Sequence, residues 1–573
     1  MKIRLPIVFV ATALLGQQIP TAAPQAGAGQ NAAPQTVEPS PTKPDDLGAM
    51  EGQVTSVETG APVKKAELVL QRVDLNRETA SVPTSYTTTS DAGGKFAMKD
   101  LEPGKYRLSV TCNGFVRGSY GSRGPNRPGA TLSLDPGQHL KQVDFKLTPH
   151  GVVTGRVVDQ DGDPLANVNV QAQTYRRQDG RKQLFPAGSA STNDLGEYRI
   201  FGLAPGRYYL SAANNRIGYE PAMRESSAKP PPEESYVPTY YPAGIDIAMA
   251  AAVDLTAGAQ MHGMNIALSK AHTVRVRGHI DIQPGADKLN TTVMLTPRNG
   301  SDFNPMGNRH AADAQGNFEI RGVRPGTYWL VAMSFGPERL SARQILNVGD
   351  SNLDNLTVEL SRGVEIAGQI KAENPDKVNL TDIYVSMRTR ERMSIYFGPT
   401  PSDHVKQDGS FTLSQVGQDV YDVYVGGMPD GYYVKSVRAG DQEVRDSGLD
   451  MTNGAAGPLT ITIGPGAGQI DGTVQNEKQQ PAAGASVVLI PNDPKLRERR
   501  DAYNAGSSDQ NGRFTLKNIV PGEYKLYAWD DMESGAYMDP DVVKPFESQG
   551  VAMSIQENGK ESAQLNLIAA EKQ

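Results

Sequence analysis

One phrase recurs along this chain and limits what the chain can fold into. It has an aromatic residue, an apolar residue five positions later, a Pro-Gly pair, and a tyrosine ten positions after the aromatic residue. The aromatic and tyrosine positions of the five copies are Phe96 and Tyr106, Tyr198 and Tyr208, Phe318 and Tyr328, Phe411 and Tyr421, and Phe514 and Tyr524. The fourth copy has Gln418 and Asp419 in place of Pro-Gly. Such a phrase indicates repeated small units instead of one large core.

A glycine within an alternating apolar segment precedes each copy of the phrase. It lies 40 to 44 residues before the aromatic position, and the five glycines are Gly52, Gly155, Gly278, Gly368 and Gly472. The two markers together make each unit about 105 residues long, which is the size of a small β-sandwich domain.

The segments between the markers have the pattern of β-strands. Ala66, Leu68 and Leu70 fall at every second position, and this period is typical of a strand with one buried face. An Asx residue such as Asp91 stands five positions before most of the aromatic residues, where its side chain can close a turn. The chain is rich in turn formers, with 59 Gly and 40 Pro. We therefore predict an all-β fold with about seven strands per unit, arranged as two packed sheets.

The order of these markers resembles a known family. Gly-x-Val, Pro-x-x-x-Ala-x-Val-x-Leu, Asp-x-x-Gly-x-Phe and Leu-x-Pro-Gly-x-Tyr are similar to the carboxypeptidase regulatory-like domain, which is grouped with collagen-adhesin B-type repeats and carbohydrate-binding-like folds. The resemblance is strong in units one, two and five, fair in three and weak in four. It implies a tandem array of about five immunoglobulin- or prealbumin-like β-sandwich domains. It implies a fold and not a reaction.

The N-terminal residues have the pattern of a targeting segment. Lys2 and Arg4 precede an apolar stretch over residues 5–15 and a run of small residues, as in a secretory signal peptide. We expect a signal peptide over 1–28 and a disordered linker over 29–48. Export would place the protein in the periplasm, at the outer cell surface or outside the cell. No later stretch approaches 18 apolar residues, so no transmembrane segment is expected in the mature chain.

The repeat markers also predict the domain boundaries. The expected domains are sandwich one (49–149), sandwich two (150–270, with a long insert rich in Tyr and Pro), sandwich three (271–362), the divergent sandwich four (363–467) and sandwich five (468–573).

Charge and cysteine content exclude several classes of protein. The formal net charge is -7, so the chain lacks the basic surface that neutralises nucleic-acid phosphates, and no nucleic-acid partner is expected. The single cysteine, Cys112, excludes a disulfide scaffold and a cysteine-ligated metal or iron–sulfur site.

Motifs that could carry catalysis are incomplete. None of the seven histidines is followed by Glu three positions later, as the zinc site of a carboxypeptidase requires. The block 349–352 reads Gly-Asp-Ser-Asn, as in GDSL-type lipases, but it lies between two strand-like segments and has no downstream Asp-x-x-His. Asp159, Asp161 and Asp163 alternate like a calcium loop, but Val170 occupies its twelfth position. We therefore expect no enzymatic activity, no cofactor and no metal.

The candidate ligand-binding residues lie in loops after the tyrosine strands. They are Tyr240 and Tyr241 in sandwich two and Trp529, Asp531 and Tyr537 in sandwich five. Aromatic faces stack on sugar rings and carboxylates accept hydroxyl hydrogen bonds, so this mixture suits a glycan. Two alternatives stay open: the aromatic side chains cover sheet ends or pack between units, or the carboxylates bind calcium.

Trp529 decides between packing and binding in sandwich five. It lies five residues after Tyr524, an odd step, so it should face away from the core of its sandwich. It then packs on sandwich four or on its own long loop, or it forms a stacking platform with Tyr537.

The function we expect is that of an exported, non-catalytic scaffold or binding protein of the cell envelope or extracellular space. Its expected partner is an extracellular glycan or an envelope protein, with carbohydrate binding as one expected activity. The alternative is a regulatory or accessory subunit of a separately encoded hydrolase, either a peptidase or a glycosidase.

Overall fold

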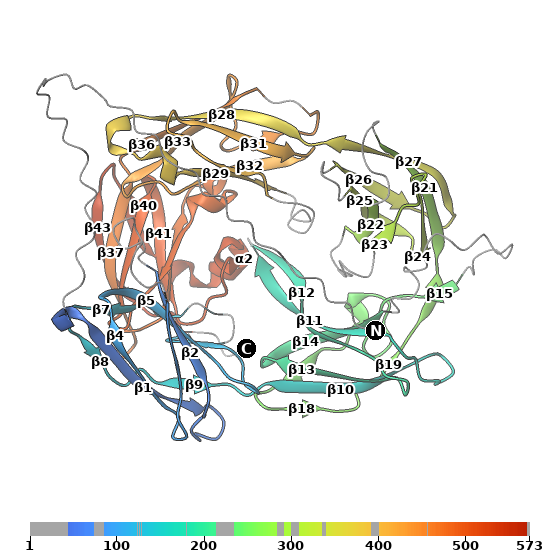
Figure 1. Ribbon diagram of the computed structural model, residues 1–573, viewed down its shortest axis with the longest axis horizontal. Helices are drawn as coiled ribbons and strands as arrows, with labels where there is room; N and C mark the ends of the chain where they lie inside the picture. The colour runs from blue at the N-terminus through green and yellow to red at the C-terminus, as the bar shows by residue number, and fades with distance from the viewer. Residues whose placement is uncertain are drawn as a thin grey trace, which may run out of the picture. The chain divides into compact units, whose positions relative to one another are not determined.

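The computed structural model describes residues 44–73, 85–122, 124, 127, 129–178, 180–213, 234–282, 291–298, 309–334, 340–390, 400–454 and 457–569. Regular structure in these residues is almost entirely β-strand, with a few short helical turns, which confirms the predicted fold class (Figure 1). Each sandwich has its own main hydrophobic cluster. Within the described residues, no helix has the length and apolar character needed to cross a membrane.

The expected N-terminal segments lie mostly outside the described residues. These are the signal peptide and residues 29–43 of the linker. The remainder of the linker is ordered, because Pro44–Asp46 form a 3-10 turn and the first strand already begins at Gly48. The expected end of the linker at residue 48 therefore lies a few residues beyond the point where ordered structure begins.

Sandwiches one and two share one arrangement of two packed sheets. The sheets of sandwich one have the orders β4-β1-β8, with β9 also on β1, and β3-β2-β5-β6, with β7 also on β5. Those of sandwich two have the orders β13-β10-β18, with β19 also on β10, and β12-β11-β14-β16, with β17 also on β14, while β15 pairs with β20. The strands of sandwich one are β1 (Gly48–Ser56), β2 (Glu67–Arg72), β3 (Ser85–Thr89), β4 (Lys95–Leu101), β5 (Gly104–Thr111), β6 (Gly118–Ser119), β7 (Leu132–Leu134), β8 (His139–Leu140) and β9 (Phe145–Leu147). The strands of sandwich two are β10 (Gly151–Val158), β11 (Asn169–Gln178), β12 (Arg181–Ser191), β13 (Glu197–Leu203), β14 (Gly206–Ala213), β15 (Glu234–Tyr236), β16 (Thr239–Tyr240), β17 (Val253–Leu255), β18 (Gln260–Met261), β19 (Ile266–Ala267) and β20 (Lys270–His272).

Sandwich three differs from the predicted pair of separate sheets. Its strands form one continuous path in the order β23-β22-β25-β26-β27-β21-β24. The strands are β21 (Val274–Ile282), β22 (Thr291–Pro297), β23 (Arg309–Ala311), β24 (Asn317–Val323), β25 (Gly326–Ser334), β26 (Leu340–Val348) and β27 (Leu353–Arg362). The two layers are joined because β26 pairs with β25 along its length and with β27 at Leu340 and Ser341.

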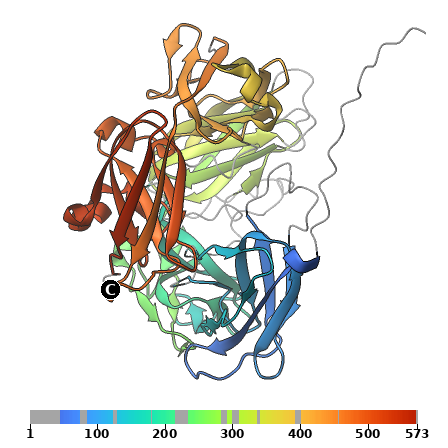
Figure 2. The same cartoon turned by 90° about the vertical axis from the view of Figure 1, so that its left-hand side faces the viewer.

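Sandwiches four and five again have two sheets each. The sheets of sandwich four have the orders β31-β28-β36-β33-β34 and β30-β29-β32-β35, and those of sandwich five β40-β37-β43 and β39-β38-β41-β42. The strands of sandwich four are β28 (Val364–Ala372), β29 (Tyr384–Thr389), β30 (Ser402–His404), β31 (Ser410–Val416), β32 (Val420–Gly426), β33 (Tyr432–Ala439), β34 (Gln442–Glu443), β35 (Leu449–Asp450) and β36 (Leu459–Pro465). Sandwich five has β37 (Gly468–Gln475), β38 (Ser486–Pro491), α1 (Pro494–Arg497), β39 (Asn504–Ser507), β40 (Arg513–Ile519), β41 (Gly522–Trp529), α2 (Pro540–Val543), β42 (Val551–Ile555) and β43 (Lys560–Asn566). In Figure 2 the short helical turns around α2 lie outside the two sheets of sandwich five.

The glycine marker and the aromatic marker meet across two neighbouring strands. Gly472 of β37 is directly opposite Phe514 of β40, and the same register joins the other four pairs. A Cβ atom added at Gly472 would lie 2.3 Å from the carbonyl oxygen of Ala563 and 2.5 Å from Cζ of Phe514. The aromatic ring therefore occupies the place of the missing side chain. This contact explains the regular spacing of the two markers along the chain.

Each repeated tyrosine closes the turn that precedes its own strand. The hydroxyl of Tyr524 donates a hydrogen bond to the carbonyl oxygen of Val520 at 2.7 Å. The equivalent bonds run from Tyr106 to Glu102 (2.6 Å), Tyr208 to Ala204 (2.6 Å), Tyr328 to Arg324 (2.8 Å) and Tyr421 to Gly417 (3.1 Å). The tyrosines are buried, except for the half-buried Tyr328. Sandwich four keeps this bond although it lacks the Pro-Gly pair. The hydroxyl bond, and not Pro-Gly, is therefore the feature that all five turns share.

A buried hydroxyl group beside the Asx turn is a further repeated feature, which the sequence markers do not reveal. Ser508 donates to the carbonyl oxygen of Ala482 at 2.6 Å and accepts from the amide of Ala485 at 2.9 Å. Ser90 and Thr192 make the same pair of bonds in sandwiches one and two. The next residue in each copy closes the turn, as Asp509 does by accepting from the amides of Asn511 and Arg513.

Candidate outward-facing binding surface

The strand of each repeated tyrosine has one face toward the core and one face away from it. The outward face carries the residues one, three and five positions after the tyrosine. These are Arg107, Ser109 and Thr111 in β5, Tyr209, Ser211 and Ala213 in β14, Trp329, Val331 and Met333 in β25, Asp422, Tyr424 and Gly426 in β32, and Lys525, Tyr527 and Trp529 in β41. The five copies can therefore be compared position by position on one face.

In sandwich five this outward face is covered by the chain itself. Trp529 is only 2% exposed, and its ring stacks on Tyr527 with centroids 4.8 Å apart and planes at 10°. The loop after β41 adds Phe546, whose ring meets Trp529 edge-on at 6.1 Å. Met532, Ala536 and Val543 belong to the same cluster. Trp529 faces away from the main core as predicted, and of the alternatives left open for it the structure shows packing under its own loop.

The other predicted site residues do not join Trp529 in one exposed patch. Tyr537 is half-buried beside Tyr503, with ring centroids 6.0 Å apart. Oδ1 of Asp531 lies 2.5 Å from Nε of Arg127. Tyr240 is buried, and the partly buried Tyr241 packs against the core of sandwich two.

Sandwich four has two exposed tyrosines on its outward face. Tyr384 of β29 is 37% exposed and Tyr424 of β32 is 38% exposed. Their ring centroids are 6.1 Å apart, and the planes are inclined at 48°. Gly426 pairs with Tyr384 across the strands, and a Cβ atom at Gly426 would lie 2.2 Å from Cζ of Tyr384. The absence of a side chain at Gly426 therefore lets the Tyr384 ring lie close against the sheet.

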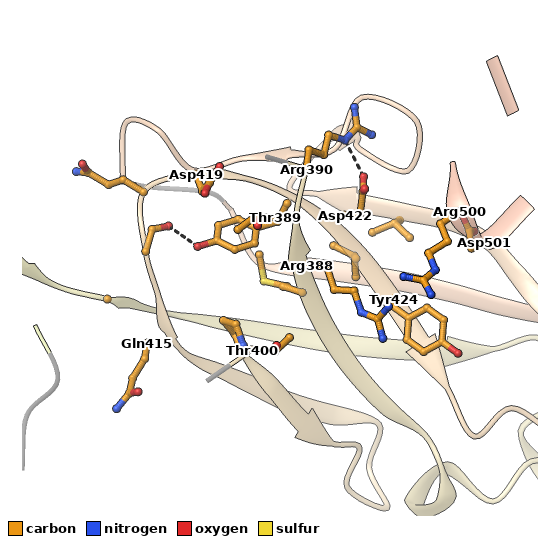
Figure 3. A pocket seen from close by; sticks show the side chains of 18 of the residues that line it. Arg388, Thr389, Arg390, Thr400, Gln415, Asp419, Asp422, Tyr424, Arg500 and Asp501 are labelled. Carbon is orange, nitrogen blue, oxygen red and sulfur yellow. Dashed lines mark hydrogen bonds and ion pairs between the residues drawn. The ribbon is translucent and has the colours of Figure 1, made fainter. Parts of the chain in front are cut away.

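Charged side chains surround this tyrosine pair. Cζ of Arg388 lies 5.4 Å from the centre of the Tyr424 ring, within the range of a cation–π contact. Arg390 donates from Nε to Oδ1 of Asp422 at 2.7 Å and from Nη2 to the carbonyl oxygen of Asp446 at 2.7 Å. Figure 3 shows Arg388 beside Tyr424, with the Arg390–Asp422 pair above them in the view. We call Tyr384, Arg388, Arg390, Asp422 and Tyr424 the sandwich-four face.

The electrostatic surroundings act on the Tyr424 phenol in opposite directions. Partial burial and the neighbouring Tyr384 raise the pKa of Tyr424, while the positive charges of Arg388 and Arg500 lower it. The pKa of Tyr424 stays above its ordinary value. The phenol is therefore neutral at physiological pH, and its ring is available as an uncharged stacking surface with a hydroxyl group at its tip.

Four residues of the sandwich-four face belong to the lining of a cavity of ≈ 1730 Å³, namely Arg388, Arg390, Asp422 and Tyr424. Figure 3 shows this lining, to which Thr389, Thr400 and Gln415 also contribute. The residues that line the cavity include eight arginines and five carboxylates, so the lining is net positive although the whole chain has a net charge of -7. Among the residues the structure describes, no group of three or more His, Cys, Asp or Glu side chains is placed to hold a metal ion.

Sequence reasoning missed the sandwich-four face. Tyr424 stands three positions after Tyr421, and this odd step puts the two side chains on opposite faces of the strand. The spacing is therefore the signal that could have shown Tyr424 to face away from the core. Tyr384 and Arg388 lie on β29, which carries none of the repeat markers. Their meeting on one face follows from the pairing of Tyr384 with Gly426 and of Ser386 with Tyr424, which the sequence alone does not provide.

Comparison with known proteins places two segments in a family. Residues 49–148 and 152–269 match the model of the carboxypeptidase regulatory-like domain, which confirms the resemblance inferred from the repeat markers. The match covers sandwiches one and two and does not include sandwich five, where the markers are also clear. No curated protein matches the chain.

Several solved structures are similar to parts of the chain. The Bacillus anthracis TIE protein is 12% identical with a TM-score of 0.16, and the match covers 55% of this chain and 51% of that protein, about half its length. The minor pilin GBS52 of Streptococcus agalactiae is 14% identical with a TM-score of 0.22, covering 39% of this chain and 96% of the pilin. Two B repeat units of the collagen binding protein of Staphylococcus aureus are 12% identical with a TM-score of 0.13, covering 73% and 99%.

Proposed function

We propose that this protein is an exported, non-catalytic binding protein of the cell envelope or extracellular space, and that the sandwich-four face binds carbohydrate. The observation that carries the proposal is the pair of exposed rings, Tyr384 and Tyr424, with their centroids 6.1 Å apart on one sheet face. Rings presented in this way can stack on the apolar faces of sugar units. Export is supported by the signal-peptide pattern at Lys2, Arg4 and residues 5–15.

Comparison among the repeats supports this choice of face. The position three residues after the repeated tyrosine carries Ser109, Ser211, Val331, Tyr424 and Tyr527 in the five sandwiches. Of these, Tyr424 is the exposed aromatic residue, since Tyr527 is buried under the loop that covers Trp529. The side chains beside Tyr424 supply hydrogen-bond donors and acceptors, namely the guanidinium groups of Arg388 and Arg390 and the carboxylate of Asp422. The rings suit the apolar faces of a sugar unit, and the polar side chains suit its hydroxyl groups.

A glycan array with the full chain tests the proposal. We expect binding to at least one class of polysaccharide, and we expect Tyr424→Ala to weaken it about tenfold or more, because a stacking contact of roughly 1.5 kcal/mol is lost. Phe201→Ala is the matched control, since Phe201 is an aromatic residue 69% exposed on sandwich two and is not among the residues that line the cavity. The bound polysaccharide should be recovered without cleavage after prolonged incubation.

Two results would contradict the proposed function. One is the absence of binding to every glycan on the array. The other is an affinity that Tyr424→Ala leaves unchanged while Phe201→Ala lowers it, which would place the binding surface on sandwich two.

A further inference from the structure

We propose that the ligand of the sandwich-four face is an acidic polysaccharide, and that Arg388 pairs with a uronate carboxylate of one sugar unit. This inference rests on the proposed function and names the chemical class of its ligand. It follows from a difference between Arg388 and the arginines around it.

Several arginines of the cavity lining already have carboxylate partners. Arg390 is paired with Asp422 at 2.7 Å, Arg343 is paired with Asp419, and Arg499 is paired with Asp446 at 2.8 Å and with Asp501. Arg388 differs, because within the described part of the chain its contact is the Tyr424 ring at 5.4 Å and it forms no ion pair. Its side chain is exposed and lies in the lining of the cavity. An exposed guanidinium group without a carboxylate is available to an anionic ligand.

The geometry of a guanidinium group selects the kind of anion. It is planar and always charged, and its parallel N–H groups bind both oxygens of a carboxylate at once. A sugar unit stacked on Tyr424 has Arg388 beside it on the same sheet face. A carboxylate carried by that unit, or by its neighbour in the polymer, can therefore pair with Arg388 while the ring remains stacked.

The electrostatic field of the charged side chains around Arg388 favours the same ligand. Arginines exceed carboxylates in the cavity lining by eight to five. Arg500 is also close enough to act on the charge of the Tyr424 phenol. An anionic polymer is therefore attracted to this surface, although the chain as a whole has a net charge of -7. An acidic peptide shares this attraction, but the two exposed rings favour a sugar, which presents flat apolar faces to them.

A pair of polymers that differ only in charge tests the inference. We would measure binding of the full chain to polygalacturonate and to the same polymer with methyl-esterified carboxyl groups, by calorimetry at low ionic strength. We expect the free acid to bind at least tenfold more tightly. Arg388→Gln should lose about tenfold in affinity for polygalacturonate and little for the ester, because a charge-assisted hydrogen bond is removed. Raising the salt concentration should weaken binding of the free acid alone.

The control variant is Arg438→Gln. Arg438 is exposed on β33, in the other sheet of the same sandwich, so its replacement should change neither affinity. Arg388 is also exposed, so Arg388→Gln should retain the circular dichroism and melting profile of the wild-type protein.

The outcomes separate the inference from the proposed function. Equal binding of the two polymers, or an equal loss in Arg388→Gln and Arg438→Gln, would overturn the inference and leave carbohydrate binding intact. Binding of neither polymer together with failure of the glycan array would overturn both. Binding of polyglutamate as tight as that of polygalacturonate, and equally sensitive to Arg388→Gln, would overturn the assignment to a polysaccharide.

Discussion

At the scale of the residue, the five repeats serve as controls for one another. The repeated tyrosine donates the same hydrogen bond to the turn before its strand in every copy, at 2.6 to 3.1 Å. The position three residues later faces outward in every copy and varies among serine, valine and tyrosine. Residues shared by all copies therefore maintain the fold, and residues that vary on the outward face are where a binding function can differ between sandwiches.

The hydroxyl bond and the ring of Tyr524 should make separable contributions to stability. Tyr524→Phe removes the bond to Val520 and should lower the free energy of unfolding of sandwich five by about 1 kcal/mol. Tyr524→Ala also removes a ring that is only 2% exposed and should cost about 3–5 kcal/mol. Urea unfolding followed by circular dichroism gives both values. Equal values for the two variants would show that the ring contributes nothing beyond its hydroxyl group.

His310 should make the stability of sandwich three depend on pH. It lies on β23 opposite the core residue Val293, and burial lowers its pKa to about 4. The unfolded chain, with the ordinary value near 6.5, binds the proton more readily, so stability is lost as the pH falls from about 6.5 toward 4. The loss should approach about 3 kcal/mol. The stability difference between wild type and His310→Gln should therefore change between pH 7.5 and 4.5, and a constant difference would show that His310 is not buried as a neutral group.

At the scale of the element, local sequence patterns predicted the strands well, but they did not predict which loops or neighbouring strands pack against the outward faces. The alternation at Ala66, Leu68 and Leu70 reports a strand with one buried face, because that pattern depends on a single strand. The burial of Trp529 depends on where residues 530–550 fold back, and no period in that loop encodes it. The sandwich-four face depends on strand register, which brings Tyr384 next to Tyr424 although they are far apart in sequence. Fold class was therefore accessible from sequence, and the candidate site was not.

The loop that covers Trp529 can be tested by fluorescence. In a Trp329→Phe background, where Trp529 is the remaining tryptophan, emission should be blue-shifted and poorly quenched by iodide, because the ring is 2% exposed. Phe546→Ala removes the edge-on contact at 6.1 Å and should shift the emission to the red. Val551→Ala is a control on the neighbouring exposed strand position and should leave the emission unchanged. A red emission before any substitution would contradict the covered face.

At the scale of the whole molecule, we propose that the five sandwiches are domains with boundaries at 49–149, 150–270, 271–362, 363–467 and 468–573. The separate main clusters support this division, since each is built from the strands of one sandwich. Limited proteolysis should yield fragments of about 100 residues that resist further cleavage. Tyr524→Ala should remove the fragment of sandwich five and spare that of sandwich one. Loss of both fragments together would show that the sandwiches unfold as one cooperative unit.

Hydrogen–deuterium exchange of the full chain, with and without the polysaccharide that binds most tightly, tests the central claim most directly. If the sandwich-four face binds carbohydrate, the ligand should slow exchange in peptides that cover β29 (Tyr384–Thr389) and β32 (Val420–Gly426). Tyr424→Ala should abolish that protection, while Phe201→Ala should preserve it. Protection confined to the loop after β41 or to sandwich two, with β29 and β32 unchanged at saturating ligand, would contradict the account.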